Sequence, residues 1–144
     1  MDNKQRVLFL SVHDSARGQM AEGFLRSMAA DRFIATSGGI ESGNELHPIA
    51  TEVMAEVGID ISGQRPKNVR EWFNEHFAYV ITLADTARER SPIFPFTPHL
   101  LHWRLRDPTV VNGTAEERKQ AFREVRDEIR TYINEFVEGV RAKV

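Results

Sequence analysis

The fold is decided by the stretch Val7-Leu8-Phe9-Leu10-Ser11-Val12-His13-Asp14-Ser15-Ala16-Arg17-Gly18-Gln19-Met20-Ala21-Glu22. It begins with a short apolar run, which is typical of a buried β-strand. Seven residues, 11–17, interrupt the apolar pattern. Apolar side chains then recur at the three- and four-residue steps of a helix, at Met20, Phe24, Leu25 and Met28. The stretch therefore predicts a strand, a short loop and a helix from Gln19 to about Ala30.

The predicted loop has the chemistry of an anion site. The first N–H groups of a helix have no intrahelical partner, and the helix dipole adds partial positive charge there. A loop wrapped over that end points more N–H groups inward. Arg17 adds a planar, charged group that suits phosphate-like oxygens. We therefore expect an oxyanion to be bound by Ser11, Val12, His13, Asp14, Ser15, Ala16 and Arg17.

Extended and helical segments alternate along the rest of the chain. The pattern predicts further strands at 32–37, 77–83 and 99–103, and helices at 48–57, at 69–77 and from 114 nearly to the C-terminus. Gly38-Gly39 is expected to stop the second strand, and Trp72 and Phe73 are expected to point inward. Three prolines predict a loop over residues 91–98. This alternation indicates an α/β fold, with a four-stranded parallel sheet covered on both faces.

Two predicted helices carry clear end signals. Pro48 suits the first position of a helix, and Gly58 suits the residue just beyond its end. Thr114 and Glu117 have the spacing of a capping box before the last helix. Ligands of such sheets bind beyond the carboxyl ends of the strands, where the strand order reverses. The 11–17 loop follows the first strand and so lies at that end.

Composition limits the classes of function. A chain of 144 residues is expected to form one domain, 1–144, and its 41% hydrophobic and 28% charged residues are ordinary for a globular protein. The net charge of −2 does not favour nucleic acid or an anionic membrane as a partner. No apolar run approaches the roughly 20 residues that span a bilayer, and no signal-peptide pattern follows Met1. We expect a cytoplasmic protein.

The sequence contains no cysteine. Disulfides, thiolate metal sites, thiol nucleophiles and thiol redox relays are therefore excluded for this chain. The histidines show no metal-ligand spacing. We expect neither a metal ion nor a cofactor.

Ser11-x5-Arg17 after the first strand resembles the Cys-x5-Arg phosphate loop of the low-molecular-weight protein tyrosine phosphatases. It is still more similar to the loop of their relatives, the thioredoxin-coupled arsenate reductases. Four segments match in order: Ser15-Ala16-Arg17 with Gln19–Gly23, Thr36–Gly39, His47–Ser62, and His102-Trp103 with Asp107-Pro108. The resemblance covers nearly the whole chain. It implies a three-layer α/β/α fold of the low-molecular-weight phosphatase (flavodoxin-like) type.

The resemblance also implies roles for three residues. Ser11 stands where the family has its nucleophilic cysteine. Arg17 matches the arginine that holds the oxyanion, and Asp107 matches the general acid. A serine hydroxyl needs an adjacent base to become a useful nucleophile. His13 is close in sequence, but such loops usually point this side chain outward.

Four other positions depart from the family pattern. Asp14 stands where the family commonly has a loop-bracing asparagine, and an ionised, inward Asp14 would repel an oxyanion. Gly18 stands where a serine or threonine often donates to the thiolate. Ala84 and Ser91 lie near the positions of the reductases' second and third cysteines, which carry electrons to thioredoxin. We expect the chain to be inactive or very weak as an enzyme.

Three interpretations follow. The first is a natural non-redox relative that binds phosphate, sulfate or arsenate weakly, on the order of millimolar, or binds a phosphorylated ligand or a protein partner. The second is a phosphatase or arsenate reductase that carries an engineered Cys-to-Ser change at Ser11. The third is a nucleotide-binding flavodoxin-like protein, for which the chain lacks both a glycine-rich fingerprint and a Walker lysine.

Overall fold

Strands and helices alternate along the residues that the computed structural model describes, which are 4–41, 45–92, 94 and 97–142. The elements are β1 (Gln5–Ser11), α1 (Arg17–Ala29), β2 (Phe33–Gly39), α2 (Pro48–Ala55), the 3-10 helix η1 (Val69–Trp72), β3 (Tyr79–Thr82), α3 (Asp85–Glu89), β4 (His99–His102), the 3-10 helix η2 (Pro108–Val110) and α4 (Ala115–Ala142). Of the predicted 91–98 loop, residues 93, 95 and 96 lie outside the described residues.

The four strands form one parallel sheet in the order β2-β1-β3-β4. The chain leaves β1 for β2 on one side and later returns to β3 on the other side. The strand order therefore reverses beside β1, which is the position where such sheets bind ligands. The predicted parallel α/β fold is confirmed, and the loop after Ser11 begins at this reversal point.

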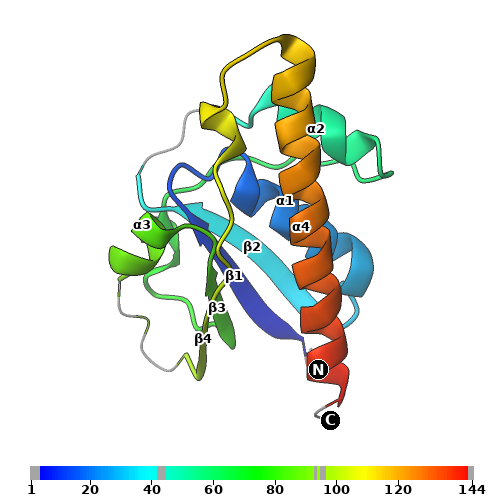
Figure 1. The fold of residues 1–144 in the computed structure, drawn as a ribbon. Coiled ribbons are helices and arrows are strands. Elements are labelled where there is room, and N and C mark those ends of the chain that lie inside the picture. The colour runs from blue at the N-terminus through cyan, green and yellow to red at the C-terminus, as the bar shows by residue number, and fades with distance from the viewer. Residues whose placement is uncertain (1–3, 42–44, 93, 95–96, 143–144) are drawn as a thin grey trace.

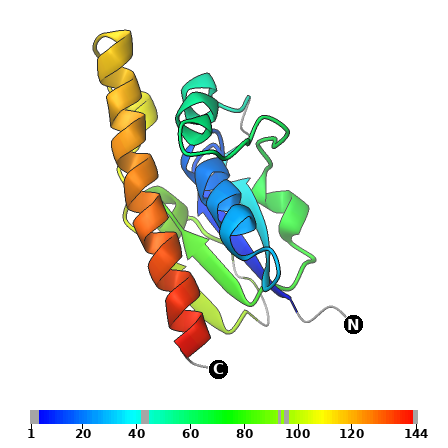
Figure 2. The same cartoon turned by 90° about the vertical axis from the view of Figure 1, so that its right-hand side faces the viewer.

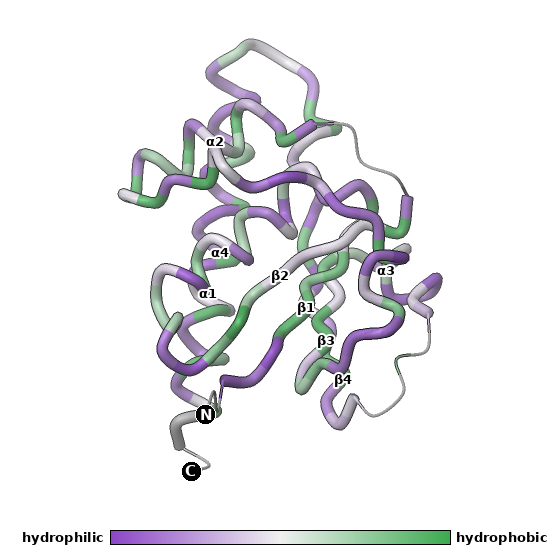
Figure 3. The backbone as a smooth tube through the Cα atoms, turned by 180° about the vertical axis from the view of Figure 1, so that it is seen from behind, coloured by the Kyte–Doolittle hydropathy of each residue, from purple (hydrophilic) through white to green (hydrophobic). Residues whose placement is uncertain are grey.

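Helices cover both faces of the sheet. α1, α2 and α4 pack on one face, and α3 and η1 lie on the other (Figures 1 and 2). Val7 and Phe9 belong to the first core, whereas Leu8 and Leu10 belong to the second. β1 turns from hydrophilic to hydrophobic along its length, as Figure 3 shows. Because β1 is buried on both faces, its apolar residues are consecutive rather than alternating.

The predicted capping box at the start of the last helix is confirmed. The Thr114 amide donates to Glu117 Oε1 (3.2 Å), and the Glu117 amide donates to Thr114 Oγ1 (3.1 Å). This reciprocal pair is a capping box. The apolar stripe of α4 is buried against α1 and α2 through Phe122, Val125, Ile129 and Ile133. None of the helices in the described ranges is long and apolar enough to cross a membrane.

The prediction that Gly38-Gly39 stops the second strand is wrong. β2 continues through both glycines, and Gly39 pairs with Ser11. A Cβ atom on Gly39 would lie 2.8 Å from the Val12 carbonyl oxygen, so the glycine allows the loop backbone to approach. The glycine pair therefore marks a close contact with the candidate site, not the end of a strand.

Two predictions on the second face also differ from the structure. Only Val69–Trp72 of the 69–77 segment is helical, as a single 3-10 turn. Trp72 packs inward and its Nε1 donates to the Ser37 carbonyl (2.9 Å), but Phe73 is exposed, contrary to prediction. α3, which the sequence did not indicate, has five residues. Such a short helix cannot display a helical period in the sequence.

Candidate oxyanion-binding site

Three carbonyl groups of the 11–17 loop are hydrogen-bonded to the segment between β2 and α2. Ser11 and Val12 carbonyls accept hydrogen bonds from the amides of Ile40 (3.1 Å) and Glu41 (2.9 Å). The Ser15 carbonyl accepts from the His47 amide (2.9 Å). These contacts fix the loop to the segment that follows β2. Because the carbonyls are engaged on the outside, the loop amides are left on the inner side.

The inner side of the loop is rich in free donors. Within the described ranges, no residue accepts a hydrogen bond from the amides of His13, Ser15 or Ala16. No side chain caps the first turn of α1, and that turn contains no acidic residue. Its N-terminal N–H groups and partial positive charge therefore face the hollow enclosed by the loop. Such an arrangement favours an anion.

Ser11 and Asp14 shape the floor of the loop. The Ser11 side chain is buried, and its Oγ accepts a hydrogen bond from the Asp14 amide (3.2 Å). Asp14 has a φ of 58°, in the left-handed region that aspartate tolerates better than most residues. The turn directs the Asp14 side chain into the protein interior, beneath the loop.

Arg17 begins α1 with a side chain that is only 8% exposed. Its Nη1 donates to the Leu105 carbonyl (3.0 Å), and its Nη2 lies 3.7 Å from Asp107 Oδ2. Burial lowers the pKa of the guanidinium, and the nearby Asp107 carboxylate opposes that shift. An arginine remains charged at any physiological pH. Arg17 is therefore a fixed positive charge at the loop.

Asp107 lies at the mouth of the hollow and is 30% exposed. Asp107 caps the η2 turn, because its Oδ1 accepts hydrogen bonds from the amide (2.9 Å) and the hydroxyl (2.6 Å) of Thr109. Its Oδ2 faces Arg17. The structure gathers all but one of the predicted site residues around one small hollow, which is lined by Ser11, His13, Asp14, Ser15, Ala16, Arg17, Asp107 and Thr109. The exception is Val12, which lines an adjoining groove.

His13 is directed to the rim of the loop. Its side chain is about half exposed, and Nδ1 lies 3.7 Å from Glu41 Oε2. No hydrogen bond joins His13 to Ser11 among the described residues. The position of the imidazole does not favour its use as a base for the Ser11 hydroxyl.

A buried polar network supports the loop from below. Asp14 Oδ2 accepts hydrogen bonds of 3.0 Å from the Lys67 amide and Gln19 Nε2, and it lies at hydrogen-bond distance, also 3.0 Å, from Ser37 Oγ. Lys67 Nζ lies 3.4 Å from Glu22 Oε1 and 4.0 Å from Asp14 Oδ2. The loop is therefore braced through a carboxyl group.

Four members of this network, Gln19, Glu22, Ser37 and Lys67, were not predicted from the sequence. Gln19 and Glu22 are polar residues at the start of a buried helix, three positions apart, and this spacing places them on one face. Ser37 lies in a buried strand. These three positions offered a signal, since polar side chains in buried elements need partners. Lys67 lies in an irregular segment and offered none.

The environment of Asp14 changes its acidity. Burial raises the pKa of this carboxyl to about 7, although Lys67 and the hydrogen bond from Ser37 lower it. The Glu22 carboxylate raises it further. Near neutral pH, the loop therefore rests on a carboxyl group that exists in both protonation states.

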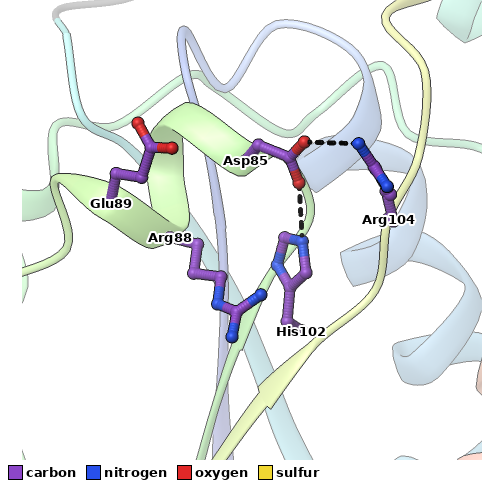
Figure 4. A pocket seen from close by; sticks show the side chains of 5 residues that line it. All are labelled: Asp85, Arg88, Glu89, His102 and Arg104. Atoms are coloured by element: carbon purple, nitrogen blue, oxygen red, sulfur yellow. Dashed lines mark hydrogen bonds and ion pairs between the residues drawn. The ribbon is translucent and has the colours of Figure 1, made fainter.

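A polar groove continues from the hollow toward α3. It shares Arg17 and Asp107 with the hollow, and Val12 and Ala84 also line it. Beyond them, Asp85 Oδ1 lies 3.0 Å from His102 Nε2, and Asp85 Oδ2 lies 3.2 Å from Arg104 (Figure 4). Within the described residues, no group of three or more acidic or histidine side chains could hold a metal ion.

The four-stranded parallel sheet with helices on both faces is the fold of solved low-molecular-weight protein tyrosine phosphatase and arsenate reductase structures. Residues 6–144 match the family model described as low molecular weight phosphotyrosine protein phosphatase, and the chain belongs to this family.

The similar proteins include arsenate reductases. That of Bacillus subtilis (strain 168) is 39% identical over 140 residues, covering 96% of this chain and 98% of the relative. That of Shouchella clausii (strain KSM-K16) is 38% identical over 136 residues, covering 94% and 97%. Among solved structures, an arsenate reductase in the phosphate binding state superposes with a TM-score of 0.81, at 30% identity, covering 94% of this chain and 98% of that chain.

Proposed function

We propose that the chain is a non-redox member of this family that binds a tetrahedral oxyanion in the 11–17 loop. Ser11 occupies the position of the nucleophilic cysteine. The observation that carries the proposal is the convergence of free loop amides, the open end of α1 and buried Arg17 on one hollow. The phosphate binding state of a similar arsenate reductase supports this class of ligand.

The same residues limit the chemistry to binding. Thiol attack on the oxyanion is impossible because the chain contains no cysteine. Among the described residues, no base is hydrogen-bonded to the Ser11 hydroxyl, and His13 is directed toward Glu41. Ala84 and Ser91 offer no thiol for a disulfide cascade. We therefore assign Ser11 a hydrogen-bonding role at the floor of the site, and expect no thioredoxin-dependent reduction of arsenate.

A specific contact argues against a single engineered Cys-to-Ser change as the origin of the sequence. A Cβ atom on residue 18 would lie 2.6 Å from Asp14 Oδ1 and 3.2 Å from Ser11 Oγ. Gly18 and the buried carboxyl of Asp14 are therefore adapted to each other. A lone substitution at Ser11 would not produce this pair, which supports the natural non-redox relative.

The binding should be weak. Arg17 already contacts the Leu105 carbonyl and Asp107, so an incoming anion must compete for its N–H groups. The buried carboxyl of Asp14 and the net charge of −2 also oppose an anion. We expect dissociation constants on the order of millimolar for phosphate, sulfate and arsenate, or about 4 kcal/mol.

Isothermal titration calorimetry with phosphate and arsenate tests the proposal. Arg17→Gln should weaken binding at least about tenfold, because it removes the charged hydrogen-bond donor of the hollow. Arg130→Gln, on the exposed face of α4, makes the same change in net charge and serves as the matched control. Equal affinities in the two variants, or arsenate turnover above a blank, would overturn the proposal. The first outcome would instead favour a protein-binding scaffold.

A further inference from the structure

The polar network beneath the loop contains an unbalanced charge. Its ionisable members are Asp14, Glu22 and Lys67, whose side chains are 0%, 10% and 9% exposed. When both carboxyl groups are ionised, the single ammonium leaves one negative charge in the interior. Arg26 lies 3.8 Å from Glu22 but is about half exposed, and the Arg65 guanidinium is exposed beside Glu71. Screening by solvent weakens the contribution of both arginines.

The Ser37 hydroxyl lies between the Asp14 and Glu22 carboxyl groups, and its two contacts indicate that one of these groups is protonated. Its Oγ lies 3.0 Å from Asp14 Oδ2 and 3.0 Å from Glu22 Oε1. A hydroxyl group has only one proton to donate. Both contacts are hydrogen bonds only when one carboxyl group is protonated. A proton on Asp14 Oδ2 satisfies this condition, since Asp14 then donates to Ser37 and Ser37 donates to Glu22.

The other oxygen of Asp14 agrees with this assignment. Oδ1 is buried and has no hydrogen-bond partner among the described residues. Residue 18, which comes closest to it, is a glycine and offers no side chain. An unpartnered oxygen is far less costly as the carbonyl of a neutral carboxyl group than as half of a buried carboxylate. The geometry therefore suits a protonated Asp14.

We propose that the loop binds its oxyanion together with one proton, which Asp14 takes up from solvent. This inference rests on the proposed oxyanion-binding function. Without the proton, an anion in the hollow faces a buried net charge of −1 directly below the loop. The proton on Asp14 Oδ2 neutralises that charge, and no other bond forms or breaks. Arg17 does not compensate Asp14, because its guanidinium is directed to Leu105 and Asp107.

The pKa of Asp14, raised by burial to about 7, places this coupling in the neutral range. An anion bound above the loop should raise that pKa further, since like charges oppose ionisation. Binding and proton uptake then favour each other, as linkage requires. The affinity for an anion of constant charge should therefore fall as the pH rises through 7.

Inorganic sulfate is the suitable probe, because it remains a dianion across the relevant pH range, whereas phosphate titrates. We expect its affinity for the wild-type chain to fall about tenfold between about pH 5.5 and about pH 8.5, which corresponds to a shift of one unit in the Asp14 pKa. Calorimetry near pH 7 in two buffers of different ionisation enthalpy should show net proton uptake. Asp14→Asn should keep the acidic-pH affinity at all pH values and take up no proton.

Two further measurements test whether Asp14 causes the fall in sulfate affinity. His13 also lies at the loop, so His13→Gln should retain the fall in affinity if Asp14 causes it. NMR of the Asp14 carboxyl carbon in the wild-type chain should give a higher titration midpoint in saturating sulfate than without sulfate. This measurement needs no variant, so it does not depend on whether a variant folds. Sulfate binding that ignores pH, or a fall retained in Asp14→Asn, would overturn this inference alone. No sulfate binding at any pH would overturn the proposed function as well.

Discussion

The two segments that face the hollow are held in different ways. The 11–17 loop rests on buried charged and polar side chains, among them Lys67, which is distant in sequence. In the 104–109 segment, the Asp107 side chain is held by a partly exposed local turn, in which it accepts two hydrogen bonds from Thr109, and it also lies 3.7 Å from Arg17. The loop is therefore fixed by a buried network, whereas the hydrogen bonds of the Asp107 side chain are local. Changes beneath the loop should alter stability strongly, and changes in the second segment should mainly alter the site.

The largest effect should come from the pH dependence that Asp14 gives to stability. Its pKa is about 7 in the folded chain, against 3.8 as the ordinary value. Below about pH 4 the carboxyl is protonated in both states. As the pH rises toward 7, only the unfolded chain loses the proton, so the folded state is penalised by about 4 kcal/mol. Urea unfolding of Asp14→Asn should show a gain over wild type that grows by this amount between pH 4 and pH 8. Parallel profiles would refute this.

Lys67→Met should have the next largest effect. It leaves two buried carboxyl groups without their ammonium, which should reduce the free energy of unfolding by about 3 kcal/mol at pH 8. The loss should be smaller at pH 6, because protonation of Asp14 then removes one of the charges. Arg65→Met is the control, since its exposed pair with Glu71 should be worth less than about 1 kcal/mol. Similar losses in the two variants would mean that the network does not support the loop.

Gly39→Ala tests the contact between the loop and β2. The new methyl group would lie 2.8 Å from the Val12 carbonyl and 2.9 Å from the Glu41 carbonyl, so the backbone must move. We expect a loss of about 2 kcal/mol in thermal or urea unfolding. Gly63→Ala is the matched control, because nothing lies within 4 Å of its added methyl group. An unchanged stability in Gly39→Ala would show that the loop is not tightly seated.

The smallest effect on stability should come from Thr109→Val. It removes one of two hydrogen bonds to Asp107 Oδ1, in a partly exposed turn, at a cost of about 0.5–1 kcal/mol. Phosphate binding should nevertheless change measurably, because Asp107 gains freedom beside Arg17. Thr86→Val, at another position in the adjoining groove, controls for the loss of a hydroxyl group. A loss as large as that of Lys67→Met would remove the contrast between the two segments.

This contrast also explains what could be predicted from the sequence. The apolar run of β1 and the capping box at Thr114 depend on neighbouring residues, so local patterns indicated them. The loop and Arg17 were recognised because strand, loop and helix are contiguous. Lys67 could not be placed beneath Asp14, since their contact joins segments that no local pattern connects. The glycines of β2 were misread for the same reason: their role is a tertiary approach to the loop.

The central claim is that residues 11–17 still form an anion-stabilising site although the nucleophile is absent. Ser11→Cys tests it most directly, because a thiolate at that position reports the field of the loop amides and Arg17. The rate of thiol alkylation against pH should give a thiol pKa clearly below the ordinary value of about 8.5, in the range of about 6–7. Adding Arg17→Gln should raise it, and adding Asp14→Asn should lower it. An ordinary or elevated thiol pKa that ignores Arg17 would contradict the account.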